Sequence, residues 1–159
     1  MQWLNFSGII FMILIMIPNI IYASYVAKHN GGFENAWQGK GAKFTHCFEQ
    51  IGRYGCFAFM IFNIPGTCFG WLFSNAFTIY FIGNISLILI YCLIWIFCFK
   101  SNSLFKAWSL SVIPSVVFLS SGIMSQSVLL LVSALIFAPC HIVISVKNIV
   151  IQKNKETNY

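Results

Sequence analysis

Five apolar runs, each about as long as a helix that crosses a lipid bilayer, dominate this sequence and restrict what it can fold into. A helix needs roughly 20 apolar residues, within a range of about 17–25, to cross the hydrocarbon core. We therefore predict an all-α, integral membrane helical bundle with five transmembrane helices in one domain, residues 1–159. The predicted spans are 6–27, 51–73, 77–99, 107–123 and 127–146.

The composition supports a lipid environment rather than an aqueous one. Hydrophobic residues make up 59% of the 159 residues and charged residues 8%, whereas a soluble domain carries about 25% charge. The lipid bilayer is thus the first expected partner. The net charge of +6 does not indicate nucleic-acid binding, because the basic residues are sparse and separated by apolar runs. Basic residues beside such runs usually set membrane orientation.

The basic residues predict that orientation. All nine lie in or beside segments that five spans place on the same face of the membrane: Lys28, Lys40, Lys43, Arg53, Lys100, Lys106, Lys147, Lys153 and Lys155. The positive-inside rule makes this face cytoplasmic. We predict the N-terminus outside, the C-terminus inside, a cytoplasmic loop over 28–45 and a cytoplasmic tail over 147–159, with localisation in a plasma membrane.

Two features of the spans qualify this prediction. The fourth span is the shortest, and a re-entrant pair formed by the fourth and fifth runs is the alternative to two full crossings.

All four prolines fall inside predicted spans, where each removes a backbone donor and frees a helix carbonyl. For Pro65 the freed carbonyl is that of Ile61.

The second run carries a polar line. With Thr45 as the predicted N-cap, Glu49 and Arg53 lie four residues apart, the favourable order for a helical ion pair. The same helical face continues inward through small and polar residues, namely Cys56, Met60, Asn63, Thr67, Gly70 and Ser74. Gly66 and Gly70 form a G-x-x-x-G pattern, which predicts a close helix contact.

This line has two interpretations. It is either a packing seam anchored by an interfacial ion pair, or one wall of a solute path with Glu49 and Arg53 as its inner gate. The packing interpretation is favoured, because the pair is expected at the membrane boundary rather than in the bilayer core.

The fifth run carries an intramembrane histidine, His141. A hydrogen bond to a neighbouring helix is its favoured role, with proton relay or ligand binding as the alternative. By depth, Asn19 and Tyr22 of the first run are its predicted partners. The adjacent Cys140 does not make a metal site, since neighbouring helical residues point about 100° apart. No metal and no cofactor are predicted.

Catalytic chemistry is not indicated. Three acidic residues occur, all Glu, and they form no carboxylate pair, nucleophile–base motif or phosphate loop. An enzyme is therefore the third-ranked interpretation. We favour a non-catalytic accessory, immunity or interaction subunit that binds a partner membrane protein or a second copy of itself. The alternative is a small oligomeric transporter or channel component with a polar path near Asn63 and His141.

The run IGRYGCFAFMIFNIPG, together with a bias toward Ile, Phe, Asn and Lys, resembles small uncharacterised multi-pass membrane proteins of low-GC Gram-positive bacteria. The resemblance centres on residues 49–70. It implies a bacterial plasma membrane, and it carries no activity or functional residues with it.

Overall fold

Helices make up most of the computed structural model, which describes residues 3–30, 36–99 and 103–157. Within these ranges the chain forms five helices: α1 (Phe6–Asn30), α2 (Lys40–Ile61), α3 (Ala76–Phe97), α4 (Leu104–Met124) and α5 (Val128–Thr157). The all-helical bundle predicted from the sequence is therefore confirmed.

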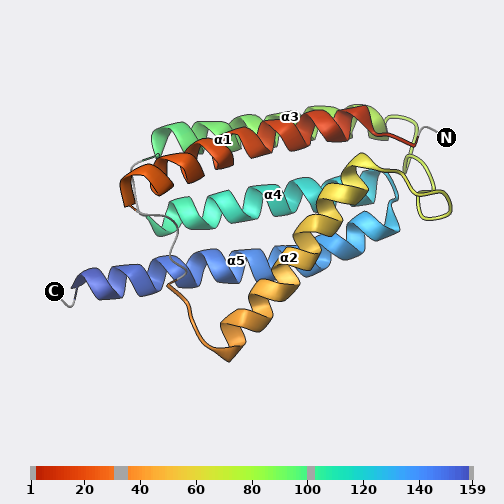
Figure 1. Cartoon of the computed structure of the whole chain (residues 1–159). Coiled ribbons are helices and arrows are strands. Elements are labelled where there is room, and N and C mark those ends of the chain that lie inside the picture. Colours follow the sequence, from red (N-terminus) through yellow and green to blue (C-terminus); the bar gives the residue numbers. More distant parts are fainter. Residues whose placement is uncertain (1–2, 31–35, 100–102, 158–159) are drawn as a thin grey trace.

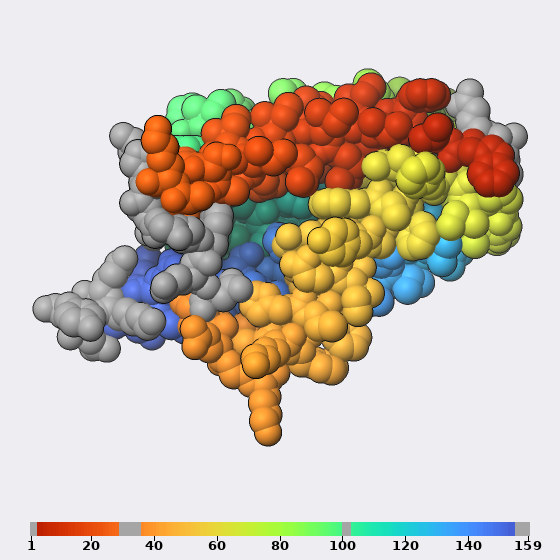
Figure 2. Space-filling view, viewed as in Figure 1, coloured from red at the N-terminus to blue at the C-terminus, as the bar shows by residue number. Residues whose placement is uncertain are grey.

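The helices pack into a bundle with one oblique member (Figure 1). α1 and α3 lie side by side along one edge, α5 runs along the other, and α4 lies between α3 and α5. α2 crosses α5 at an angle and makes its most extensive contact there. Figure 2 shows the first turns of α2, in orange, standing out from the body of the molecule.

Among the described residues, four helices are long and apolar enough to cross a membrane: Phe6–Lys28, Ala76–Phe97, Leu104–Met124 and Val128–Asn154. They match four of the five predicted spans, and both α4 and α5 are long enough for full crossings. The remaining predicted span, 51–73, has different bounds in the structure. α2 begins earlier, at Lys40, ends at Ile61, and contains four charged residues, so it is not among the apolar candidates.

The end of α2 follows from the residues after it. Proline disfavours the helical conformation in the residue before it, here Ile64. Gly66 then has a φ of +85°, a value that an L side chain rarely adopts. The carbonyl of Ile61 is satisfied by the backbone N–H of Asn5 at 2.8 Å, so the α2 terminus is paired with the N-terminal segment instead of continuing as a helix.

Backbone pairing gathers three segments at one end of the bundle. An antiparallel bridge joins Leu4 to Phe62, and a second joins Cys68 to Ser127 in the α4–α5 turn. At the opposite end, the backbone N–H of Trp37 donates to the side chain of Asn148 on α5 at 2.9 Å. α2 thus leads from one end of the bundle to the other. We call the end that holds Leu4 and Ser127 the uncharged end and the other the basic end.

Two helix boundaries differ from the predicted ones in ways that affect side chains. Thr45, predicted to cap α2, lies inside the helix and donates its hydroxyl to the Gly41 carbonyl at 2.9 Å; the capping position is Gly39. α5 continues to Thr157, so most of the segment predicted as a tail from residue 147 is helical.

Small residues allow α2 to lie against α5. A Cβ added to Gly52 would lie 2.7 Å from the backbone nitrogen of Phe137, and one added to Gly55 would lie 2.4 Å from Oγ of Ser133. Contacts this short cannot be accommodated without moving a helix. The close approach of these two helices brings the polar residues of α2 and α5 together.

Candidate functional site

A buried carboxylate lies at the crossing of α2 and α5. Glu49 is 1% exposed. Arg53, one turn further along α2, donates from Nε to Glu49 Oε1 at 2.9 Å, and a terminal guanidinium nitrogen contacts the same oxygen. From α5, Nδ1 of His141 lies 3.1 Å from that oxygen. We call these three residues the ion cluster.

Arg53 and His141 differ from the carboxylate in their access to water. The side chain of Arg53 is 36% exposed and that of His141 is 22% exposed. Arg53 and His141 thus engage, from two different helices, a carboxylate that is itself out of reach of water. A buried carboxylate needs such partners, because an unpaired one is costly in the interior.

The His141 ring is held in place by α5 itself. It stacks on Phe137 with ring centroids 4.6 Å apart and planes inclined by 21°. The sequence predicted Asn19 and Tyr22 as the partners of His141, and this is wrong: the partner is Glu49. Matching by depth pointed to α1, whereas the glycines of α2 bring that helix onto α5 instead.

Asn19 and Tyr22 take part in other contacts. The hydroxyl of Tyr91 on α3 donates to Asn19 Oδ1 at 2.8 Å. The ring of Tyr22 lies under the ammonium group of Lys106, with Nζ 4.4 Å from the ring centroid. Both residues therefore tie α1 to its neighbours α3 and α4, and neither belongs to the ion cluster.

Lys106, which the sequence analysis named only among the residues that set the membrane orientation, is buried. Its Nζ lies between the rings of Tyr22 and Trp95, 5.0 Å from the Trp95 centroid, and donates to the carbonyl of Phe99 at 2.9 Å. Ring faces attract cations through their quadrupole. The carbonyl and the two aromatic faces together stabilise a charge for which no carboxylate is supplied among the described residues.

Asn63 and Thr67 lie in the connection after α2, away from the ion cluster. The backbone N–H of Asn63 donates to the carbonyl of Trp3 at 2.9 Å, and the Thr67 hydroxyl donates to the carbonyl of Ile64 at 2.9 Å. The predicted polar line from Glu49 to Thr67 is therefore divided: its first part faces α5, and its second part forms the uncharged end.

The close helix contact predicted at Gly66 and Gly70 is also corrected. Both glycines have positive φ, +85° and +103°, and a Cβ added to either would meet no atom within 4 Å. They serve the turns of the connection between α2 and α3. The close contacts of α2 lie at Gly52 and Gly55 instead, where the sequence also has glycines three residues apart on the helix.

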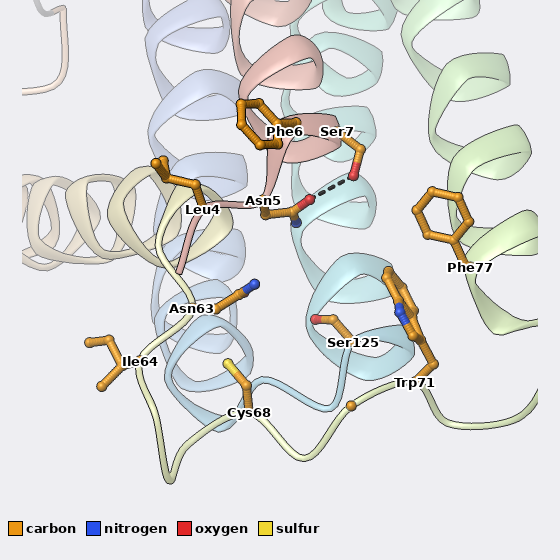
Figure 3. Close-up of a pocket in the computed structure, with 11 residues that line it drawn as sticks. Leu4, Asn5, Phe6, Ser7, Asn63, Ile64, Cys68, Trp71, Phe77 and Ser125 are labelled. Atoms are coloured by element: carbon orange, nitrogen blue, oxygen red, sulfur yellow. Dashed lines mark hydrogen bonds between the residues drawn. The ribbon is translucent and has the colours of Figure 1, made fainter. Parts of the chain in front are cut away.

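A cavity of about 430 Å³ opens at the uncharged end (Figure 3). Its wall combines aromatic and polar side chains from α1, the α2–α3 connection and the start of α3, including Asn5, Asn63, Trp71 and Phe77. Asn5 accepts a hydrogen bond from the Ser7 hydroxyl at 2.6 Å and donates to the Tyr80 hydroxyl at 3.3 Å. The cavity wall is thus joined to the interior of the bundle through Tyr80.

A further polar contact, between Asn84 of α3 and two serines of α4, lies in the interior of the bundle. Asn84 on α3, 2% exposed, donates to the Ser121 hydroxyl on α4 at 3.1 Å and accepts from Ser120 at 3.3 Å. Sequence reasoning missed this contact and Tyr91. The spacing of Tyr80, Asn84 and Tyr91 places them on one face of a helix, and that pattern could have identified them.

In the described ranges, no group of three or more His, Cys, Asp or Glu side chains is placed so that it could hold a metal ion. The six cysteines are free thiols. Comparison with protein-family models, with curated proteins and with solved structures finds no match. Interpretation of the site therefore depends on its geometry.

Proposed function

We propose that this protein is an integral plasma-membrane protein of a bacterium, with five helices that lead across the bilayer, the N-terminus outside and the C-terminus in the cytoplasm. Four apolar helices support membrane insertion. α2 connects the two ends of the bundle, so it supplies the crossing needed between α1 and α3 although it is amphipathic. The described lysines that flank the helices gather at the basic end, which favours a cytoplasmic position for that end.

We further propose that it acts as a non-catalytic accessory, immunity or interaction subunit, and that its docking surface is the uncharged end. The cavity in Figure 3 carries this proposal. Four segments build it: residues 4–7, the α2–α3 connection, the start of α3 and the α4–α5 turn. Its wall presents Trp71 and Phe77 beside the amides of Asn5 and Asn63, and Phe69 of the same connection is 70% exposed. Aromatic side chains around a small polar pocket are typical of protein–protein interfaces.

The ion cluster supports the same proposal, because all of its partners come from this chain. Glu49 is buried, and this chain supplies both of the partners that satisfy it, Arg53 and His141. A carboxylate engaged in this way holds α2 against α5. It is not aimed into an open path, as a gate would be.

Site-specific photo-crosslinking tests the proposed surface. A photoreactive phenylalanine at Phe69 should form an adduct with another membrane protein in native cells, or with a second copy of this chain. The same group at Phe97, at the basic end and 82% exposed, is the matched control and should contact lipid. Equal protein adducts at both positions, or none at Phe69, would reject the docking surface.

A transport role is the second candidate. The observation that favours it is the series of polar contacts inside the bundle, from Asn5 and Tyr80 through Asn84 and Ser121 toward Tyr91. Flux measurements in proteoliposomes test this role. Transport by the purified protein that is abolished by Asn84→Ala, with the fold retained, would favour this candidate over an accessory subunit.

A further inference from the structure

A second cavity, of about 500 Å³, lies at the basic end, where the connection before α2 meets the first turns of that helix. Its wall includes Trp37, Lys40, Lys43 and His46. The position of Trp37 is fixed by its hydrogen bond to Asn148. The cavity is thus built by this connection and the first turns of α2, and the connection is tied to α5 through Trp37.

The charges around this cavity have one sign. Lys40 and Lys43 are exposed, and Nζ of Lys147 lies 4.2 Å from the centroid of the Trp37 ring that forms part of the wall. The one carboxylate side chain that the structure describes is Glu49, and it is engaged by the ion cluster. Among the side chains that the structure describes, the cations at this cavity therefore have no acidic partner.

Two further groups at the cavity are suited to an anion. Nε2 of His46 is buried and has no hydrogen-bond partner, although buried polar atoms nearly always have one. The N-terminus of α2 also opens here, and no side chain caps it at Gly39. Free N–H groups and the helix dipole add to the attraction for negative charge.

An exposed apolar stripe runs along α2 beside the cavity. It consists of Phe44, Phe48 and Ile51, which are 67%, 39% and 58% exposed. All three side chains belong to α2, whose first turns stand out from the bundle in Figure 2. A soluble anion would leave this stripe uncovered, whereas a phospholipid would occupy both surfaces, with its phosphate in the cavity and its acyl chains on the stripe.

We propose that the cavity formed by Trp37, Lys40, Lys43 and His46 binds the phosphate headgroup of an anionic phospholipid, whose acyl chains lie along Phe44, Phe48 and Ile51. The lysines pair with the phosphate, the His46 nitrogen donates to a headgroup oxygen, and Trp37 lies at headgroup depth, where tryptophan is enriched. The bound lipid would cover the exposed face of the amphipathic helix.

The test uses the full-length protein in zwitterionic detergent, with retained phosphatidylglycerol counted by native mass spectrometry and thermal unfolding measured in parallel. Phosphatidylcholine and inorganic phosphate are the comparison probes. Lys40→Gln/Lys43→Gln should weaken phosphatidylglycerol binding roughly thirtyfold, since each lysine near a membrane contributes about a factor of five. The control Lys28→Gln/Lys153→Gln removes the same charge elsewhere and should leave the affinity within roughly threefold of wild type.

The outcomes separate the two parts of the site. Phe44→Ser/Phe48→Ser should weaken binding of long-chain phosphatidylglycerol and leave that of a short-chain analogue unchanged. Stabilisation by inorganic phosphate equal to that by phosphatidylglycerol would overturn the lipid assignment in favour of a free anion. Equal binding of phosphatidylglycerol by the wild type and the Lys40→Gln/Lys43→Gln variant would overturn the site itself.

Discussion

Removing the exposed cation of the ion cluster should destabilise the protein more than removing the buried anion. Arg53→Met leaves the carboxylate of Glu49 at 1% exposure with His141 as its remaining partner. Breaking a fully buried ion pair by removing one partner costs about 3–5 kcal/mol. Because Arg53 is about one-third exposed and His141 remains, we expect a cost of about 2–3 kcal/mol.

Glu49→Gln has a smaller expected effect. The amide keeps an oxygen that accepts from Arg53. Both Arg53 and His141 are partly exposed, so they regain hydration. The cost should be near that of weakening one hydrogen bond, about 1 kcal/mol. The double variant Glu49→Gln/Arg53→Met should then be more stable than Arg53→Met alone, because no ionised carboxylate is left in the interior.

Equilibrium unfolding in mixed micelles, followed by helix content, measures these differences. Leu135→Met, an exposed apolar site on the same α5 helix, is a control that should be close to neutral. The reasoning fails if Glu49→Gln costs as much as Arg53→Met, or if adding Glu49→Gln to Arg53→Met lowers the stability further. Either result would mean that burial of the carboxylate is not what makes this cluster sensitive.

Three other predictions concern packing and orientation. Gly52→Ala should cost several kcal/mol in the same unfolding assay, because its Cβ would meet the α5 backbone at 2.7 Å, whereas Gly83→Ala has open space and should be neutral or stabilising by up to about 1 kcal/mol. Tyr91→Phe removes the hydrogen bond to α1 and should cost about 1 kcal/mol, and a neutral result would show that this bond adds nothing. Reporter fusions at the C-terminus and at Asn75 should report opposite faces of the membrane; the same face for both would contradict the proposed orientation.

Hydropathy was sufficient to predict four helices and insufficient to place the end of the remaining one. The run 51–73 is mostly apolar both before and after Ile61, so its hydropathy does not distinguish helix from connection. Its helix ends at Ile61, where pairing with the N-terminal segment and with the α4–α5 turn takes over. Those partners lie far away in sequence, which is why a local reading extended the helix through Pro65.

The ion cluster was predicted in part for a related reason. The spacing of Glu49 and Arg53 within one helix predicts their pairing, and the structure confirms it. The contribution of His141 depends on which helices are neighbours, and equal depth in the membrane does not decide that. The deciding residue is Gly52, whose missing side chain lets α5 approach at Phe137.

The two ends of this bundle are held together by different chemistry. At the basic end, Lys106 joins the start of α4 to the rings of Tyr22 and Trp95 on α1 and α3, while Glu49 joins α2 to His141 of α5. At the uncharged end, backbone hydrogen bonds of the connections replace side-chain charges.

The difference matters because lipid tails are as apolar as the helices, so burial of apolar surface contributes little to helix association inside a bilayer. Specific polar contacts and close packing must supply it. A substitution in the ion cluster should therefore loosen α2 and α5 at the basic end, next to the cavity of Lys40 and His46. The cavity at the uncharged end should keep its shape, since the hydrogen bonds that close it do not involve the ion cluster.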